Sequence, residues 1–177
     1  MISIRTAGAA DAGVLAELAA ATFALACPPH TTHEAIAAFV RDVLSESNFD
    51  AYLADRGRML FLAEDPETGL PLGYTMLIFG EPGDPEVLAA IGIRPTVELS
   101  KCYLRAESHG RGAAAALMTA TLDAARDRGA RGAWLGVNQE NARAIRFYGK
   151  HGFARVGTKH FLVGDRFEDD FVLERAL

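Results

Sequence analysis

The spacing of apolar residues along the chain separates helical stretches from strands. From Asp11 onward, the apolar positions Val14, Leu15, Leu18 and Phe23 fall on one helical face, and alanine fills much of the rest. Similar spacing predicts further helices over residues 31–44, 47–54, 112–128 and 141–151. Alternating or short continuous apolar runs predict strands over residues 2–5, 59–63, 72–79, 96–104, 133–137, 153–162 and 167–174.

Capping residues and helix breakers set the ends of these elements. Residues 27–30, with two adjacent prolines, end the first helix because proline cannot continue it. Thr31 is expected to cap the second helix, with Glu34 closing a capping box, and Ser47 or Asn48 is expected to cap the third. The glycines expected just past the last two helices are Gly129 and Gly152.

The order of the predicted elements is β-α-α-β-β-β-α-β-α-β-β. This order implies an α/β fold around a sheet of mixed direction. Residues 65–69 form a turn by composition and join two strands into a hairpin, whereas residues 87–95 fit either a short helix or an irregular crossover. A chain of 177 residues without repeat or linker favours a single domain over residues 1–177.

Charge is distributed unevenly along the chain, whose formal net charge is −5. Residues 101–151 hold nine Lys and Arg against four Asp and Glu, and the rest of the chain holds nine against nineteen. A basic middle in an acidic protein fits a polyanionic small ligand there and a cationic partner elsewhere, but differently charged helical faces explain it equally well. The negative total argues against a nucleic-acid partner.

Cysteine usage and the first residues bear on the cellular compartment. Cys27 and Cys102 lie far apart, and residues 1–5 lack the basic-then-apolar order of a signal peptide, so we expect reduced thiols in a cytoplasmic protein. No Cys/His group has the spacing of a zinc site, so no metal is expected. No run reaches about 18 apolar residues, so no membrane span is expected.

A glycine-rich turn at residues 109–118 stands between a predicted strand and an alanine-rich helix. Such a turn binds anions, because the first amides of a helix lack partners and the helix dipole adds positive charge. Gly110 and Gly112 would let a ligand approach the backbone closely. A Rossmann turn is disfavoured by Ala115 and by the lack of an acid about 20 residues on, and a P-loop sequence is absent. A plain strand-to-helix turn is the alternative.

Two blocks of sequence carry a family resemblance. Residues 109–114, His-Gly-Arg-Gly-Ala-Ala, and residues 141–153, Asn-Ala-Arg-Ala-Ile-Arg-Phe-Tyr-Gly-Lys-His-Gly-Phe, lie about thirty residues apart with a predicted strand between them. Together they resemble the motifs of the GCN5-related N-acetyltransferases, the GNAT superfamily, although His109 replaces the usual Gln or Arg. The resemblance implies the GNAT fold: a central mixed, mostly antiparallel β-sheet of about seven strands, flanked by helices on both faces.

The resemblance also implies acetyl-CoA as co-substrate, with its pyrophosphate on the glycine turn. The amides of residues 111–114 would be the donors, and Arg111 would add charge. Asn141 would touch the pantetheine arm, although helix capping alone also explains it. The residues that the resemblance places on the cofactor are Cys102, Tyr103, Leu104, His109, Gly110, Arg111, Gly112, Ala113, Ala114, Asn138, Asn141, Ala144, Phe147 and Lys150.

Acetyl transfer to an amine needs a neutral amine, a stabilised carbonyl oxygen and a protonated leaving thiolate. By resemblance, Tyr148 is the general acid; the alternative is an aromatic residue on the apolar face of its helix. Glu98 interrupts an apolar strand, so we expect it to be the base, acting through water, or else to lie on a wet face or pair with Arg94. Cys102 is not expected to be a nucleophile, because no histidine partner is evident.

The function implied by the resemblance is N-acetylation of a primary amine, on a small molecule rather than on nucleic acid. The strand at 99–104 and residues 163–165 with Asp170 look most like the polyamine-acetylating, PaiA-like branch. The alternatives are an amino-terminal or lysine protein acetyltransferase, an antibiotic-modifying enzyme, or an acyl-CoA-binding regulator without turnover. Because many members of this fold pair, a homodimer is also expected.

Polar residues outside these motifs have two interpretations each. His30 and His33 would border the acceptor site or be exposed loop residues. Seven acidic residues would attract a cationic acceptor or simply be solvated, which is the default. They are Glu81, Asp84, Glu86, Asp165, Glu168, Asp169 and Asp170.

Overall fold

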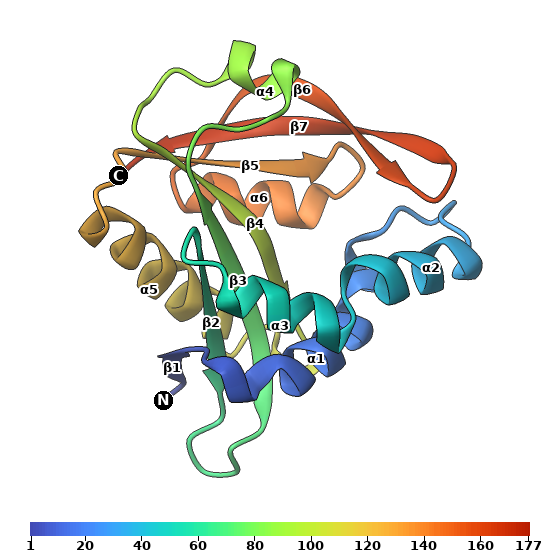
Figure 1. The fold of residues 1–177 in the computed structure, drawn as a ribbon, viewed down its shortest axis with the longest axis vertical. Helices are drawn as coiled ribbons and strands as arrows, with labels where there is room; N and C mark the ends of the chain where they lie inside the picture. The colour runs from blue at the N-terminus through green and yellow to red at the C-terminus, as the bar shows by residue number, and fades with distance from the viewer.

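The computed structural model describes all 177 residues and contains one seven-stranded sheet in the order β1-β2-β3-β4-β5-β7-β6 (Figure 1). Only the β4–β5 pair is parallel. The strands are β1 (Ser3–Thr6), β2 (Arg58–Glu64), β3 (Pro71–Phe79), β4 (Thr96–Leu104), β5 (Gly132–Asn138), β6 (Ala154–Val163) and β7 (Arg166–Ala176). The helices are α1 (Ala12–Ala26), α2 (His33–Val43), α3 (Glu46–Ala54), α4 (Pro85–Ala90), α5 (Ala113–Asp127) and α6 (Ala142–Lys150).

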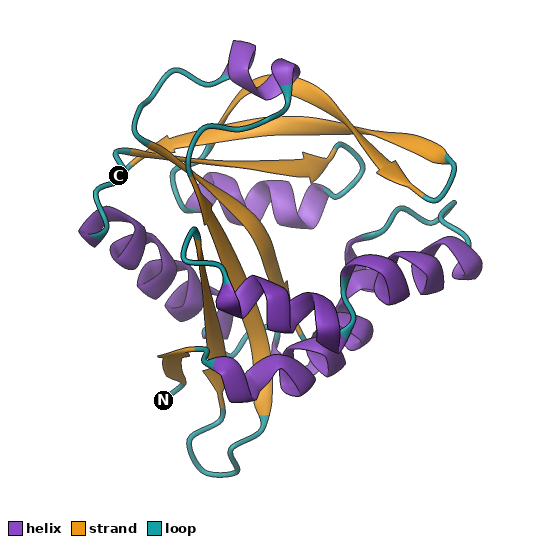
Figure 2. Cartoon of the chain, viewed as in Figure 1, coloured by secondary structure: helices purple, strands orange, loops and turns teal.

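Helices cover both faces of the sheet, as the resemblance implied (Figure 2). One face packs on α5 and α6 and holds the larger core, which includes Leu77, Leu117 and Leu135. The other packs on α1, α2 and α3 around Leu15 and Phe49. The mixed, mostly antiparallel α/β GNAT fold is therefore confirmed.

Residues Ala9–Ala26 are long and apolar enough to cross a membrane by length and composition alone, with a mean hydropathy of 1.5. In the structure most of this stretch is α1. Leu15, Leu18 and Ala19 are fully buried against the sheet and neighbouring helices. One third of the stretch is buried in the fold, and Asp11 and Glu17 interrupt its apolar composition.

Two predicted helix caps are wrong by one or more residues. Thr32, not Thr31, caps α2, because its hydroxyl is the one that accepts the Ala35 amide at 3.1 Å. Ser45, not Ser47 or Asn48, caps α3. Its hydroxyl accepts the Asn48 amide while the Asn48 side chain accepts the Ser45 amide, and this reciprocal box fixes the start of the helix.

A β-bulge at Ser100 changes which side chains of β4 face which core. The register pairs Leu99 with Leu77 and Lys101 with Met76, so Ser100 is one extra residue on β4. Before the bulge, odd-numbered positions face the α5 core; after it, Cys102 and Leu104 do. Glu98, Lys101 and Tyr103 consequently share the opposite face, which α1 and α2 cover.

The two parallel strands part early. β4 and β5 pair only between Thr96–Glu98 and Gly132–Trp134. Beyond these residues the facing edges of both strands have no strand partner, and Figure 1 shows β5, with β6 and β7, turning away from the direction of β4. Unpaired strand edges expose backbone donors and acceptors, so the gap between the strands can receive a polar, extended ligand.

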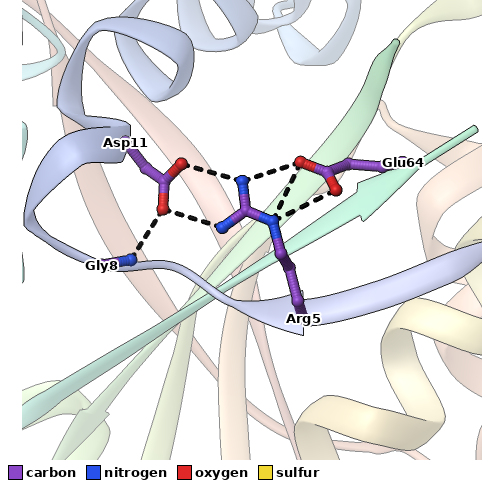
Figure 3. Close-up of polar contacts among 4 residues, drawn as sticks. All are labelled: Arg5, Gly8, Asp11 and Glu64. Atoms are coloured by element: carbon purple, nitrogen blue, oxygen red, sulfur yellow. Dashed lines mark hydrogen bonds and ion pairs between the residues drawn. The ribbon is translucent and has the colours of Figure 1, made fainter. Parts of the chain in front are cut away.

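Arg5 ties the first strand to the sheet and to the start of α1 (Figure 3). Its guanidinium donates to both oxygens of Asp11 at 2.8 and 2.9 Å and to Glu64 at 2.8 to 3.1 Å. Asp11 also accepts the Gly8 amide at 2.7 Å. The hydrogen bond from Arg5 holds the pKa of Asp11 below its usual value.

We expect Asp11→Asn to lower the free energy of unfolding by about 1 kcal/mol at pH 7, because a bidentate, charge-assisted contact is lost. A lowered folded-state pKa means that this stability is present above the pKa of the unfolded carboxyl and is lost as pH falls. Urea unfolding at pH 7 and pH 3 should therefore show a difference that shrinks in acid. Asp123→Asn, in an exposed pair with Arg126, is the matched control, and an equal loss there would contradict the interpretation.

Candidate active site

Two adjoining cavities open at the gap between β4 and β5. The first, of about 220 Å³, contains the buried charged groups of the site, and we call it the polar cavity; the second, of about 170 Å³, we call the channel. The residues that line both are Ala26, Cys102, Tyr103, Asn141, Ala144 and Tyr148. A ligand in the channel therefore meets a ligand in the polar cavity at these side chains.

The channel runs to the amino-terminal end of α5. Gly110 and Gly112 have positive φ of 82° and 77°, a conformation that suits glycine, and this turn leaves the amides of residues 112–115 without a hydrogen-bond partner. His109 and Arg143 line the channel. Burial and the neighbouring Arg143 lower the pKa of His109. Free amides, a helix dipole and one guanidinium make this end of the channel suitable for phosphate groups.

Most of the residues expected on the cofactor lie here. Those that line the channel are Cys102, Tyr103, Leu104, His109, Ala114, Asn141, Ala144 and Phe147, and those in the adjoining turn are Gly110, Gly112 and Ala113. Asn138 instead lines the polar cavity, and Lys150 lines neither space.

Arg111 does not sit as expected. Its guanidinium forms a 2.9 Å ion pair with Asp65 of the β2–β3 turn, and its amide donates to the Ser108 carbonyl. The free donors therefore begin at Gly112 rather than at residue 111. The missed cation is Arg143, whose position inside the second motif, two residues after Asn141, was the available signal.

Tyr148 stands where the two cavities meet. The centroid of its ring lies 5.5 Å from that of Phe147 and 5.9 Å from that of Phe153, and the neighbouring Cys102 and Tyr103 add to the effect of burial on the pKa of its hydroxyl. Burial raises the pKa of Tyr148 well above its usual value, so the phenol is a proton donor at any neutral pH. Asn141 caps the same helix by accepting the Ala144 amide at 3.1 Å.

Cys102 is a thiol, not a thiolate. Burial raises its pKa to about 12, and a protonated thiol is a poor nucleophile. A covalent cysteine step is therefore disfavoured by the structure as well.

The polar cavity collects buried charges from several strands. Burial raises the pKa of Glu98, against the opposing effect of Lys159, Lys101 and Arg58. Burial also lowers the pKa of Lys101 to about 8 and raises that of Asp170 to about 6. Groups that titrate near neutral pH suit proton transfer.

Arg94 is not the partner of Glu98. It donates to Glu81 at 3.3 Å and to the Ile91 carbonyl at 2.7 Å. Glu98 accepts no hydrogen bond from the protein; it precedes the bulge, and the regular alternation of the strand turns its side chain into the polar cavity.

The seven acidic residues divide into three groups. Asp165 and Asp169 are exposed. A second group supports α4 and its surroundings: Asp84 caps the helix, Glu86 bonds the His160 ring at 3.0 Å, and Glu81 holds Arg94. Glu168 and Asp170 were expected to be solvated by default, and this is wrong. Each is only 6% exposed and lines the polar cavity, because alternate positions of β7 face inward.

His30 contacts Glu168, one of the residues that line the polar cavity. It lies in the loop between α1 and α2, which Figure 1 shows reaching the β6–β7 hairpin, and its Nε2 is 2.6 Å from Glu168. Its Nδ1 is 3.5 Å from Glu140. Each ring nitrogen thus faces a different carboxylate, and the ligand atoms of His30, Glu140 and Glu168 lie within 4.8 Å of one another, a grouping that could hold a metal ion. His33 is exposed at the start of α2.

The comparisons with known proteins agree with this geometry. The model of the Acetyltransferase (GNAT) family matches residues 21–153. An uncharacterized N-acetyltransferase of Mycobacterium tuberculosis is 47% identical over 167 residues, covering 94% of this chain and 98% of the relative. This chain belongs to the GNAT acetyltransferase family. It is an acetyl-CoA-dependent N-acetyltransferase.

Solved structures share the fold at lower identity. The PaiA N-acetyltransferase of Thermoplasma acidophilum, in complex with coenzyme A, superposes with a TM-score of 0.78 at 19% identity, covering 100% of this chain and 99% of that one. The yncA acetyltransferase of Salmonella typhimurium, with acetyl-CoA, gives 0.71 at 21%, covering 100% and 94%. GNAT homologues thus bind coenzyme A, and the free amides at the start of α5 fit such a pyrophosphate group.

We expect Arg143→Ala to weaken coenzyme A binding about tenfold, because one charge-assisted contact is worth somewhat more than 1 kcal/mol. The loss should diminish at high salt. Arg146→Ala is the matched control, since Arg146 lies on the same helix but lines neither cavity. Isothermal titration calorimetry measures both, and similar losses in the two variants would remove Arg143 from the site.

Proposed function

We propose that this GNAT enzyme acetylates a primary amine of a small molecule bound in the polar cavity, by direct attack on the thioester. The observation that carries the proposal is the position of Tyr148 on the shared wall. On one side lies a channel that ends in free helix amides; on the other lies a cavity with acidic side chains. An anionic co-substrate and a cationic acceptor would approach from opposite sides and meet there.

Three groups of the chain supply what the reaction needs. Glu98, when ionised, takes the proton of the acceptor ammonium through water, which leaves a neutral nucleophile. An amide on the unpaired edge of β4 donates to the carbonyl oxygen. Tyr148 donates its proton to the departing thiolate, which suits a phenol that stays protonated at neutral pH.

The enclosure of the cavity favours a small acceptor over a protein terminus. Phe23 and Phe39, whose stacked rings lie 4.4 Å apart, line it, and its lining residue Glu168 is held by His30. Buried carboxylates favour a cationic acceptor, which supports the polyamine-acetylating, PaiA-like interpretation within this class. A cytoplasmic location, consistent with the free thiols Cys27 and Cys102, and a homodimer complete the proposal.

A thiol-release assay with acetyl-CoA tests the proposal across polyamines, amino acids, aminoglycosides and peptides. We expect turnover with a cationic small amine, and Tyr148→Phe to slow it about 100-fold while coenzyme A binding stays within a few-fold. Phe153→Leu, at a ring that packs on Tyr148 but lines neither cavity, is the control for packing. Turnover restricted to peptides would favour a protein acetyltransferase. Binding of acetyl-CoA without thiol release from any amine would contradict the proposed reaction.

Glu98 is tested by the pH profile of kcat/KM for the best amine. A base must be ionised, so the rate should rise with pH through the pKa of Glu98, which burial raises above its ordinary value. Glu98→Gln should abolish this acidic limb and lower the rate about 100-fold. Glu81→Gln, on an exposed carboxylate outside both cavities, should leave the profile unchanged. An acidic limb that survives in Glu98→Gln would assign the base elsewhere.

A further inference from the structure

Lysine is rare in this chain and concentrated at the polar cavity. Of the 18 basic residues only three are lysines, and two of them, Lys101 and Lys159, line the polar cavity. Lysine differs from arginine in being a compact point charge on a flexible stem. The polar cavity, proposed to bind an amine, thus contains two ammonium groups of the chain itself.

Lys159 reaches the cavity from two strands away. It starts on β6 opposite Asp170 of β7, which is itself opposite Asn138 of β5. Its side chain crosses β7 and lies over Gly136 of β5. A Cβ at position 136 would stand 2.6 Å from the Lys159 Cε and 3.3 Å from the Asp170 Oδ2. Glycine at 136 therefore leaves the space in which the lysine stem lies.

The two carboxylates beside this ammonium have no other firm partner. Neither Glu98 nor Asp170 accepts a hydrogen bond from the protein, and Asp170 is only 6% exposed. Buried carboxylates without a counter-charge take up protons. A cation between them is therefore needed if both are to be ionised.

Each charge that faces these carboxylates can be named. Glu98 is faced by Lys159, Lys101 and Arg58. Arg58 is itself paired with Asp55 at 3.0 Å, and Lys101, whose pKa burial lowers to about 8, faces Glu98 but not Asp170. The groups that face Asp170 are Lys159, Glu168 and Asp169. Lys159 is thus the one cation common to both, and its Nζ also lies 5.1 Å from the Phe161 ring centroid.

We propose that Lys159 is a positioning residue: held over Gly136, its ammonium keeps Glu98 and Asp170 ionised at the place where the acceptor amine binds. Lys159 does not take part in the transfer itself. It acts through Glu98, which must be charged to accept the proton of the acceptor, and through Asp170, which adds attraction for a cation. This inference rests on the acetyl-transfer function proposed for the cavity.

The test titrates the carboxyl groups of the full-length protein without ligand, by carbon-13 NMR, in two different variants. Lys159→Met removes the cation, and Gly136→Ala keeps it but displaces its stem. Both should raise the titration midpoints of Glu98 and Asp170 by about one pH unit, and Glu98→Gln and Asp170→Asn assign the signals. Arg155→Met is the matched control, because Arg155 is an exposed cation on the same strand that stacks on Phe171 outside the cavity.

In the same variants the acidic limb of the kcat/KM profile should move to higher pH by about one pH unit. Below the midpoint kcat/KM should then fall about tenfold, and on the alkaline plateau it should change little. Unchanged midpoints in both variants, or a uniform loss of rate at every pH, would overturn the inference. If the midpoints shift in the variants but the wild-type protein acetylates no amine, the role of Lys159 stands and the proposed function is refuted. If one variant does not fold, the other still decides the matter.

Discussion

The early parting of β4 and β5 is the constraint on which the whole site depends. Parallel strands that stay paired satisfy the backbone groups between them and leave no room for a ligand. Here pairing stops at Glu98 and Trp134, and α6 brings Tyr148 to the gap. The bulge at Ser100 then turns the later residues of β4, so that polar side chains face one cavity and Cys102 faces the other core.

The two spaces on either side of Tyr148 have opposite electrostatic character. The channel offers unpaired amides, His109 and Arg143, whereas the polar cavity holds more carboxylates than ammonium groups. Reactants of opposite charge can therefore be attracted separately and still meet at one phenol. Burial favours the neutral form of Tyr148 and Cys102, so these two side chains on the wall shared by the cavities carry little charge.

Local signals predicted most of the fold and the channel, and long-range contacts decided the rest. Apolar periodicity located the strands, and glycine spacing located the turn before α5. The bulge at Ser100 left no sequence signal, because serine fits a regular strand equally well. Arg111 was misplaced because Asp65, its partner, lies 46 positions away. The sequence shows that Glu168 and Asp170 lie on the same face of β7. Whether that face is exposed to solvent depends on which elements cover it, and these are distant in the sequence.

The scarcity of lysine has a chemical consequence for an enzyme that handles an activated acyl group. Arginine stays protonated and is not acylated under mild conditions, whereas an unprotonated lysine is. With fifteen arginines carrying the remaining positive charge, the outer surface offers Lys150 as its only lysine side chain away from the polar cavity. The protein can thus remain basic around its channel while giving a thioester almost no side-chain amine to attack it at random.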